Sequence, residues 1–387
     1  MTSDRTPLPI GLLAAGAFLG ASAARIIDPL LHVVATDFAT TVPAVSVIVA
    51  AFSLPYGLCQ VVLGPLGDRF GKLRIILFAL CAYIVALIGC AMATSLPMLT
   101  LMRVFAGATC AAAVPIGMAY IADAVPYAQR QITLTKFLNG TVLAQILAGP
   151  VGGIFGQYFG WRGVFIALAA ATLAVVIALA IRLRSLPDPK REGATFSLTN
   201  YITLARPGLP RIILLAGFID GALLMGAFPF LAPYLREQFE LPYAVIGLIL
   251  ACFGVGALIY TRTARLLLPK LGEAGLVIAG GILMTVVLTI GMISPAWQAF
   301  IIVQILLGLG YYMLHAVLQA QATEMLPNAR GTAVASFALA LFMGQSIGAL
   351  GIGFLIAHFN YRTAFLVDAA LILALAIWLR GRLRLAA

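Results

Sequence analysis

Charged residues are scarce in this sequence. Only 10% of its 387 residues are charged and 63% are apolar, whereas soluble globular proteins have about a quarter charged and about half apolar residues. So few polar groups cannot cover a water-soluble domain of this length, and no stretch combines low hydropathy with high charge as disordered segments do. We therefore expect lipid to be the solvent for most of the chain.

The sequence also lacks the motifs of metal, disulfide and enzyme chemistry. Its five Cys residues lie in apolar stretches without CxxC or CxxxH spacing, so we expect no metal site, no cofactor and no disulfide framework. No HExxH or GxSxG motif occurs, which makes an intramembrane enzyme the less favoured alternative. The first nine residues lead into a long apolar run without a small-residue cleavage pattern, which indicates a retained first helix.

Long apolar runs dominate what is present. A transmembrane helix needs about 20 apolar residues, and breaking the runs at charged residues or at Gly and Pro clusters predicts twelve such helices. The expected fold class is an all-α membrane protein with twelve transmembrane helices. The predicted ranges are 9–34, 43–65, 73–94, 97–122, 131–157, 162–184, 211–235, 242–265, 273–294, 296–323, 331–357 and 361–380.

Lys and Arg are concentrated on one side of these helices. An even number of helices places both chain ends on the same side, and the connections there hold nearly all Lys and Arg of the connecting segments. The other side has only Arg162, Arg236 and Arg362. The positive-inside rule then predicts that both termini are cytoplasmic. Topology therefore explains the net charge of +11, and no nucleic-acid partner is expected.

The chain divides into two similar halves. A Pro-rich connection, 185–210, separates a predicted six-helix bundle at 1–184 from a second at 211–387. Shifting the second half back by about 200 residues aligns acids, prolines and arginines at the helix ends, which indicates a parallel repeat of the kind found in secondary transporters. The matched residues are Asp123, Pro126, Arg130, Phe137, Gln145, Gly153, Phe159, Arg162 and Phe165, with Glu324, Pro327, Arg330, Phe337, Gln345, Gly353, Phe359, Arg362 and Phe365.

The connection between the second and third predicted helices, residues 64–74, reads Gly-Pro-Leu-Gly-Asp-Arg-Phe-Gly-Lys-Leu-Arg. It resembles the G-x-L-x-D-R-x-G-R/K-R/K signature of the major facilitator superfamily. A Gly-rich loop with one acid and several cations predicts a cytoplasmic gate, and positive-inside decoration is the alternative. The predicted gate residues are Gly64, Asp68, Arg69, Gly71 and Arg74, together with a latch of Asp123 with Arg130 and Glu324 with Arg330, for which ordinary helix-end ion pairing is the alternative.

Three further motifs extend this resemblance over the whole chain. Arg103 and Gly107 resemble the family's R-x-x-x-G element, and 25–38 resembles the first helix of bacterial drug and metabolite efflux members. In the fifth predicted helix, 149–153 reads Gly-Pro-Val-Gly-Gly and resembles the G-P-x-G-G element of its antiporters. The resemblance implies that this element favours antiport, while small residues at this spacing also indicate close helix packing. The residues concerned are Gly149, Pro150, Gly152 and Gly153.

Ionisable residues inside apolar runs are functional candidates, because they are expensive in lipid. Asp220 is near the middle of its helix without a cation on the same helix, and Asp28 lies in the outer third beside Pro29. We predict that both acids couple transport to protons. For Asp28 the alternative is a mutually satisfied pair with Arg25, and for His315 it is a core histidine.

Polar residues recur at helical spacing on several helices and predict a central cavity. Such a cavity, with acids, arginines and amides among many Phe and Met residues, suits a mid-sized amphipathic or cationic compound. The predicted cavity residues are Arg25, Tyr56, Gln60, Arg103, Gln145, Gln304, Tyr311, His315, Gln319 and Gln345.

Together these features predict a monomeric transporter of the bacterial inner membrane. It is expected to work by alternating access and to export a small organic compound, a drug or a metabolite, in exchange for protons. Proton symport or facilitated import of a sugar or an organic acid is the alternative. The expected partners are protons, the lipid bilayer and a small-molecule substrate.

Overall fold

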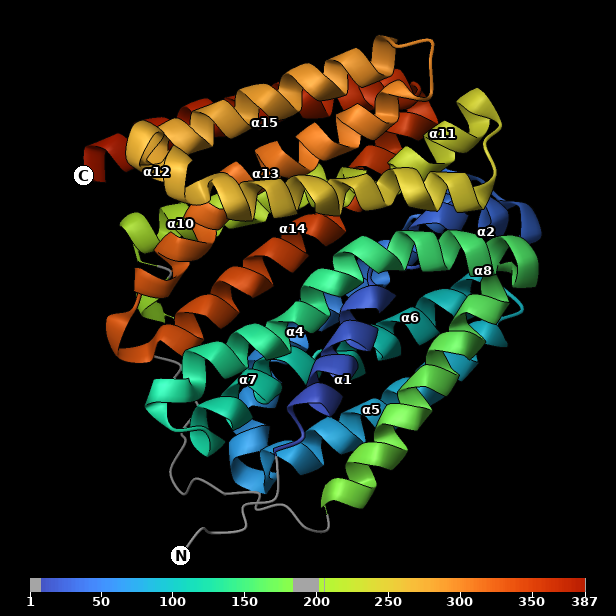
Figure 1. Ribbon diagram of the computed structural model, residues 1–387. Coiled ribbons are helices and arrows are strands. Elements are labelled where there is room, and N and C mark those ends of the chain that lie inside the picture. Colours follow the sequence, from blue (N-terminus) through green and yellow to red (C-terminus); the bar gives the residue numbers. More distant parts are fainter. Residues whose placement is uncertain (1–7, 184–201, 205, 387) are drawn as a thin grey trace, which may run out of the picture.

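The computed structural model describes residues 8–183, 202–204 and 206–386. Within these residues every regular element is a helix (Figure 1). Most of the predicted linker 185–210 lies outside the described residues. Ten helical segments are long and apolar enough to cross a membrane, and two of them, Gln129–Leu183 and Tyr243–Ile293, are 55 and 51 residues long.

Each of these two long segments is a pair of antiparallel helices. The chain reverses at Gly160 (φ +71°) in the first and at Gly272 (φ +64°) in the second (Figure 1). Positive φ is easily adopted by glycine, because glycine has no Cβ. The ten segments therefore provide twelve crossings, as the apolar runs predict.

The helices form two groups that lie side by side (Figure 1). We call them the first and the second bundle. The first contains α1 (Ile10–Ala23), η1 (Asp28–Leu30), α2 (Leu31–Asp37), α3 (Val42–Val45), α4 (Val47–Phe70), α5 (Lys72–Ala91), α6 (Leu96–Cys110), α7 (Ala113–Ala124) and α8 (Tyr127–Leu183). The second contains α10 (Leu209–Asp220), η2 (Gly221–Met225), η3 (Phe228–Phe230), α11 (Leu231–Phe239), α12 (Tyr243–Ile293), α13 (Ala299–Glu324), η4 (Pro327–Ala329), α14 (Arg330–His358) and α15 (Tyr361–Ala386).

The first helix of each bundle is broken, although the sequence predicts one continuous run in each case. Proline removes a backbone donor and clashes with the preceding turn. Pro29 accordingly lies in the 3₁₀ segment η1, and Pro229 in the 3₁₀ segment η3. A π-helical segment, η2, precedes η3, and such segments often occur at functional sites. The breaks place Arg25, Asp28 and Met225 on irregular backbone between the bundles.

The two bundles meet mainly through α4 with α14 and through α8 with α12. Glycines bring the backbones together: a Cβ added at Gly153 would meet the Tyr243 carbonyl of α12. At the end of the molecule that holds Gly160, which we call the far end, the Ala244 N–H donates to the Gln157 side chain at 3.1 Å. Nearby, His32 and Glu237 approach to 3.5 Å. The bundles are therefore joined at the far end.

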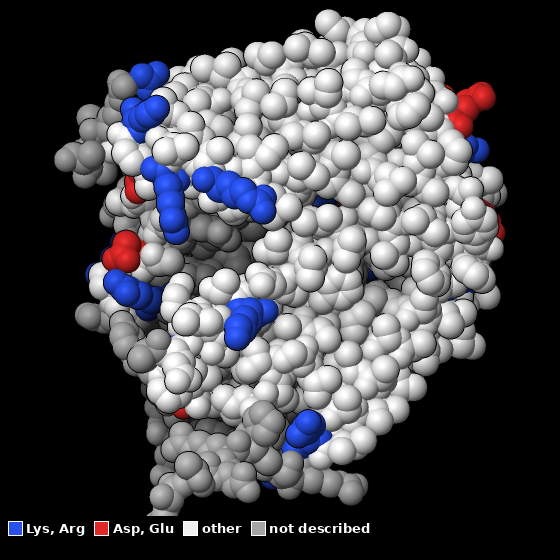
Figure 2. Space-filling model, viewed as in Figure 1, with Lys and Arg blue, Asp and Glu red and all other residues white. Residues whose placement is uncertain are grey.

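The opposite end, which holds Gly71, Gly272 and the end of α15, we call the basic end. Figure 2 shows Lys and Arg side chains gathered along this edge, around a hollow in the surface. The contrast between a joined far end and a hollowed basic end describes a state that is closed on one side of the molecule.

A buried ion pair links two helices at the basic end of the first bundle. Lys72 Nζ at the start of α5 lies 2.8 Å from Asp123 Oδ2 near the end of α7, and the two side chains are only 3% and 11% exposed. In the second bundle, Arg330 and Glu324 pair at 3.2 Å, but both side chains are more than half exposed. A buried pair depends on both partners, whereas an exposed pair contributes little.

We predict that Lys72→Met destabilises the protein by about 3 kcal/mol, because it removes one partner of a buried pair. Arg330→Met is the matched control and should lower the melting temperature of the purified protein only slightly. Thermal unfolding in detergent measures both changes. Equal melting temperatures for the two variants would contradict the structural role of the Lys72–Asp123 pair.

We also predict that Gly153→Ala opens the far end, because the added methyl group would overlap the Tyr243 carbonyl across the bundle interface. Gly351→Ala is the control: it also replaces a helical glycine, but its methyl group would meet no atom within 4 Å. Spin labels on the exposed residues Tyr158 and Phe359 should move apart in Gly153→Ala, as measured by electron–electron double resonance. Unchanged distances in this variant would show that the interface tolerates the methyl group.

Candidate functional site

A small cavity of about 10 Å³ lies between the two bundles. That volume is close to the space of a single water molecule. Residues from both bundles line it: Arg25, Asp28, Gln145, Gly149, Phe228, Leu250 and Phe253. Because its wall is shared, a movement of one bundle against the other changes the size of the cavity.

Arg25 has a weak set of partners in this cavity. One guanidinium nitrogen lies 3.5 Å from Asp28 Oδ2, and another lies 2.6 Å from the sulfur of Met225 in the second bundle. The guanidinium also lies 4.4 Å from the ring centre of Phe228. A thioether is a poor acceptor for a guanidinium, which has five donors. Arg25 thus bridges the bundles and has donor capacity left for a stronger acceptor.

Asp28 is buried, with 1% exposure, on the 3₁₀ segment η1. Its Oδ2 has the long contact with Arg25, and its Oδ1 has no partner among the described residues. The pair that we considered as the alternative interpretation therefore exists, but it satisfies Asp28 incompletely.

Asp220 has a partner that lies on another helix. Its Oδ2 is 2.7 Å from Nδ1 of His315 on α13, and both side chains are buried. The His315 ring stacks on Tyr311, with ring centres 4.8 Å apart. The sequence predicts that Asp220 has no partner on its own helix. The structure gives it a partner on another helix, 95 residues away in the sequence. Whether the ring nitrogen donates or accepts in this bond depends on the His315 tautomer.

Arg103 lies inside the first bundle and not in the lining of the cavity. It is fully buried and donates to the carbonyls of Ala23, at 3.0 Å, and Ile48, at 3.3 Å. The Ala23 carbonyl is free to accept because α1 ends there. Gln304, its counterpart in the repeat, is also fully buried, and neither atom of its amide has a partner among the described residues.

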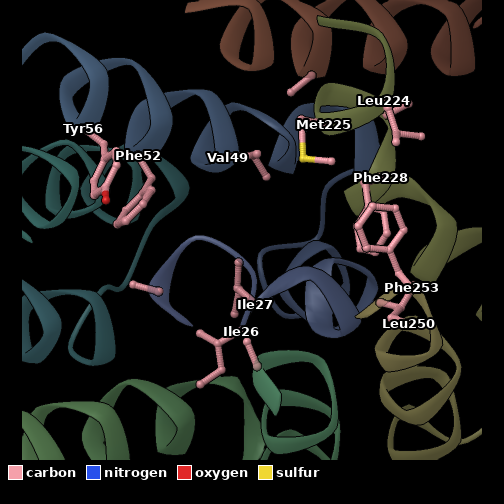
Figure 3. Close-up of a cluster of buried hydrophobic side chains, with 14 of the residues drawn as sticks. Ile26, Ile27, Val49, Phe52, Tyr56, Leu224, Met225, Phe228, Leu250 and Phe253 are labelled. Carbon is pink, nitrogen blue, oxygen red and sulfur yellow. The ribbon is translucent and has the colours of Figure 1, made fainter. Parts of the chain in front are cut away.

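The other predicted cavity residues fall into three environments. Tyr56 and the neighbouring Phe52 belong to an apolar cluster between the bundles that also contains Met225 and Phe253 (Figure 3), and the Tyr56 ring contacts Phe342 at 4.7 Å. Buried positions are occupied by Tyr311 and Gln345, and a half-buried one by Gln60. Gln145 and Gln319 are exposed, and of these two only Gln145 lines the small cavity.

The predicted gate lies at the basic end. The surroundings of Gly64 and the side chain of Asp68 lie outside the part of the chain that the structure describes. Gly71, with φ +97°, forms the turn between α4 and α5, while Arg69 and Arg74 are exposed.

Of the two predicted latch pairs, only Glu324–Arg330 is in contact among the described residues. Asp123 pairs with Lys72, and Arg130 donates to the Val125 carbonyl at 3.5 Å. This differs from the predicted Asp123–Arg130 pair, because the turn after α4 brings Lys72 to the end of α7. The corresponding pair Glu324–Arg330 is formed.

The glycines of the fifth helix face two neighbours. An added Cβ at Gly152 would overlap the Ile26 carbonyl of the first helix, whereas Gly149 and Gly153 face Gly247 and Tyr243 of α12. Pro150 lies within α8 between them. These contacts are those expected of close helix packing, and a role of this element in favouring antiport stays a prediction.

Three residues outside the predicted site are prominent in the structure, and of these Lys72 belongs to the 64–74 motif. Met225 contacts Arg25, Lys72 is a buried partner of Asp123, and Asp368 is a buried acid on α15. A signal existed for Asp368, because it is the single acid in an apolar run. No sequence signal indicates that a methionine would contact an arginine.

Comparisons with known proteins agree on one family. The family described as Major Facilitator Superfamily matches residues 13–209 and 213–385. Among curated proteins, the uncharacterized MFS-type transporter YceJ of Bacillus subtilis is 27% identical over 88% of this chain and 88% of its own length. The chloramphenicol resistance protein of Streptomyces lividans is 25% identical over 96% of this chain and 95% of its own length.

Solved structures show the same fold. A bacterial homolog of the human lysosomal transporter Spinster, in an inward-facing and unoccupied conformation, has a TM-score of 0.76 at 16% identity, covering 96% of this chain and 94% of that one. A D-xylose–proton symporter has a TM-score of 0.76 at 16% identity, covering 95% and 96%. The predicted all-α membrane fold is therefore confirmed. This chain belongs to the Major Facilitator Superfamily.

Proposed function

We propose that this chain exports a small organic compound from a bacterial cell by exchanging it for protons. The observation that carries the proposal is the buried Asp220–His315 pair in the second bundle, together with the incompletely satisfied Arg25–Asp28 pair in the shared cavity. The first pair can exchange a proton, and the second can contact a substrate. Similarity to a chloramphenicol resistance protein favours export.

The distribution of Lys and Arg supports an orientation with the basic end, and both termini, in the cytoplasm of an inner-membrane protein. In that orientation the hollowed basic end would face the cytoplasm and the joined far end would face outward. The cavity of about 10 Å³ is too small for an organic substrate, so substrate binding requires the bundles to separate around Arg25 and Asp28. The gate residues would then close the cytoplasmic side in the opposite state, and the protein would act as a monomer.

A proton gradient can drive this cycle. Moving one elementary charge through 100 mV releases about 2.3 kcal/mol. An acid–histidine pair that is protonated from outside and releases its proton to the cytoplasm would use this energy for export. The Asp220–His315 pair is suited to the task because both partners titrate and their bond joins α10, next to the π-helical segment η2, to α13.

Import by proton symport or facilitated diffusion remains the second candidate, since the same pairs could serve either direction. Cells that lack the protein would fail to acquire the substrate if it is an importer, and would accumulate it if it is an exporter. An intramembrane enzyme is less favoured, and product formation by the purified protein would reveal one.

We predict that Asp220→Asn and His315→Gln each abolish proton-driven uptake of chloramphenicol into inverted vesicles while leaving its binding within about twofold of the unchanged protein. The physical reason is that either change removes proton exchange at the pair but leaves the cavity lining intact. His358→Gln is the matched control, because His358 is exposed and bonds only to the Phe354 carbonyl among the described residues.

The decisive measurement is the pH dependence of uptake. If Asp220→Asn and His315→Gln both transport against a gradient with the original pH dependence, the pair does not couple transport to protons. If neither the unchanged protein nor the variants transport chloramphenicol, the same comparison is made with the compound that accumulates in cells lacking the protein.

We predict that Asp28→Asn weakens the binding of the cation tetraphenylphosphonium about tenfold, which corresponds to about 1.4 kcal/mol. The affinity for the neutral compound chloramphenicol should fall less, because the Asn side chain keeps the shape of the site and removes only its negative charge. Fluorescence quenching or calorimetry with purified protein measures both affinities. Equal losses for the two compounds would show that Asp28 acts through structure and not through charge.

A further inference from the structure

Asp368 is a buried acid that the proposed mechanism does not use. It lies on α15, about 10 Å along the helix from its start at the far end. Its side chain is 2% exposed, and neither carboxylate oxygen has a hydrogen-bond partner within the part of the chain that the structure describes. By contrast, the other two acids buried within the helices, Asp28 and Asp220, have Arg25 and His315 as partners.

The repeat shows that this position does not require an acid. At the shift of 200 residues that aligns Phe165 with Phe365, the counterpart of Asp368 is Leu168, which is likewise buried. Leucine therefore fills the equivalent place in the first bundle. An acid here gains nothing for packing, so its presence indicates a function.

The surroundings of Asp368 offer no counter-charge. α15 packs against α10, η2, α14 and the second part of α12, where Thr285 donates to the Ala369 carbonyl at 2.9 Å, and it also meets α11 through ring contacts. The titratable or charged side chains that α15 and these elements carry away from the basic end are Asp220, Tyr234, Arg236, Glu237, His358, Tyr361 and Arg362, and none bonds to Asp368. The remaining charged side chains of these elements lie at the basic end.

A carboxylate without a partner is unstable in such a site, and the neutral acid is the form that burial favours. We propose that Asp368 is a second proton-binding site, which holds a proton while the far end is closed. The proton leaves, by cleavage of the carboxyl O–H bond to a water molecule, when the bundle rearranges and water reaches the acid.

The π-helical segment is the element that could connect this site to transport. η2 packs against α15 on one side and continues directly from Asp220, and its last residue, Met225, contacts Arg25 in the cavity. A change of charge on Asp368 would therefore act on the segment that joins the proton pair to the substrate site. This coupling rests on the proposed function, whereas the protonation of Asp368 does not.

Infrared spectroscopy of the purified full chain tests the protonation. The carbonyl band of a protonated carboxylic acid should be present at neutral pH in the unchanged protein and lose intensity in both Asp368→Asn and Asp368→Leu. Asp37→Asn is the matched control and should leave the band unchanged, because Asp37 is exposed and pairs with Arg162. Retention of full band intensity in both Asp368 variants would overturn the proposal, even if proton antiport is established.

Transport in inverted vesicles tests the coupling. Asp368→Asn, which cannot lose a proton, should flatten the pH dependence of chloramphenicol uptake while its affinity for chloramphenicol stays within twofold. Loss of the infrared band with an unchanged pH dependence would overturn the coupling, and Asp368 would then be a permanently neutral acid. If the chain transports without protons, the infrared result still decides whether Asp368 carries one.

Discussion

In the hydrocarbon of a membrane the backbone N–H and C=O groups must find their partners within the protein, and the structure is organised by this constraint. Helices satisfy the backbone almost everywhere. Where prolines break the first helix of each bundle, other groups take over: Arg103 donates to the Ala23 carbonyl that the end of α1 leaves free. Arg103, which the sequence predicts to line the substrate cavity, therefore stabilises a helix break in this state.

The same helix breaks also form the candidate substrate site between the two bundles. Irregular backbone at Pro29 and Pro229 brings Arg25 and Asp28 of one bundle against Met225 and Phe228 of the other. The contacts of Arg25 with the second bundle are electrostatically weak, because its partners there are a thioether and an aromatic ring and not a carboxylate. A site that is held together weakly can exchange its internal partners for a substrate when the bundles separate.

Buried charges in this protein differ in how completely they are satisfied, and the difference separates structure from function. Lys72 and Asp123 form a short buried pair that joins two helices of one bundle. The Asp220–His315 pair is equally short, but it joins an acid to an imidazole, and we propose that it exchanges a proton. Asp368 is the extreme case among the described residues, with no partner for either oxygen.

The sequence by itself determined the membrane environment, the twelve helices and the family, because these depend on the length of apolar runs and on motifs that are local in the chain. It also predicted a repeat and identified Arg25, Asp28 and Asp220 as candidate functional residues. Only the tertiary structure decided their partners. Helical periodicity assigns a residue to a face but does not say which helix that face meets, so the His315 partner of Asp220, the inward packing of Arg103 and the isolation of Asp368 emerge only when helices distant in sequence pack together.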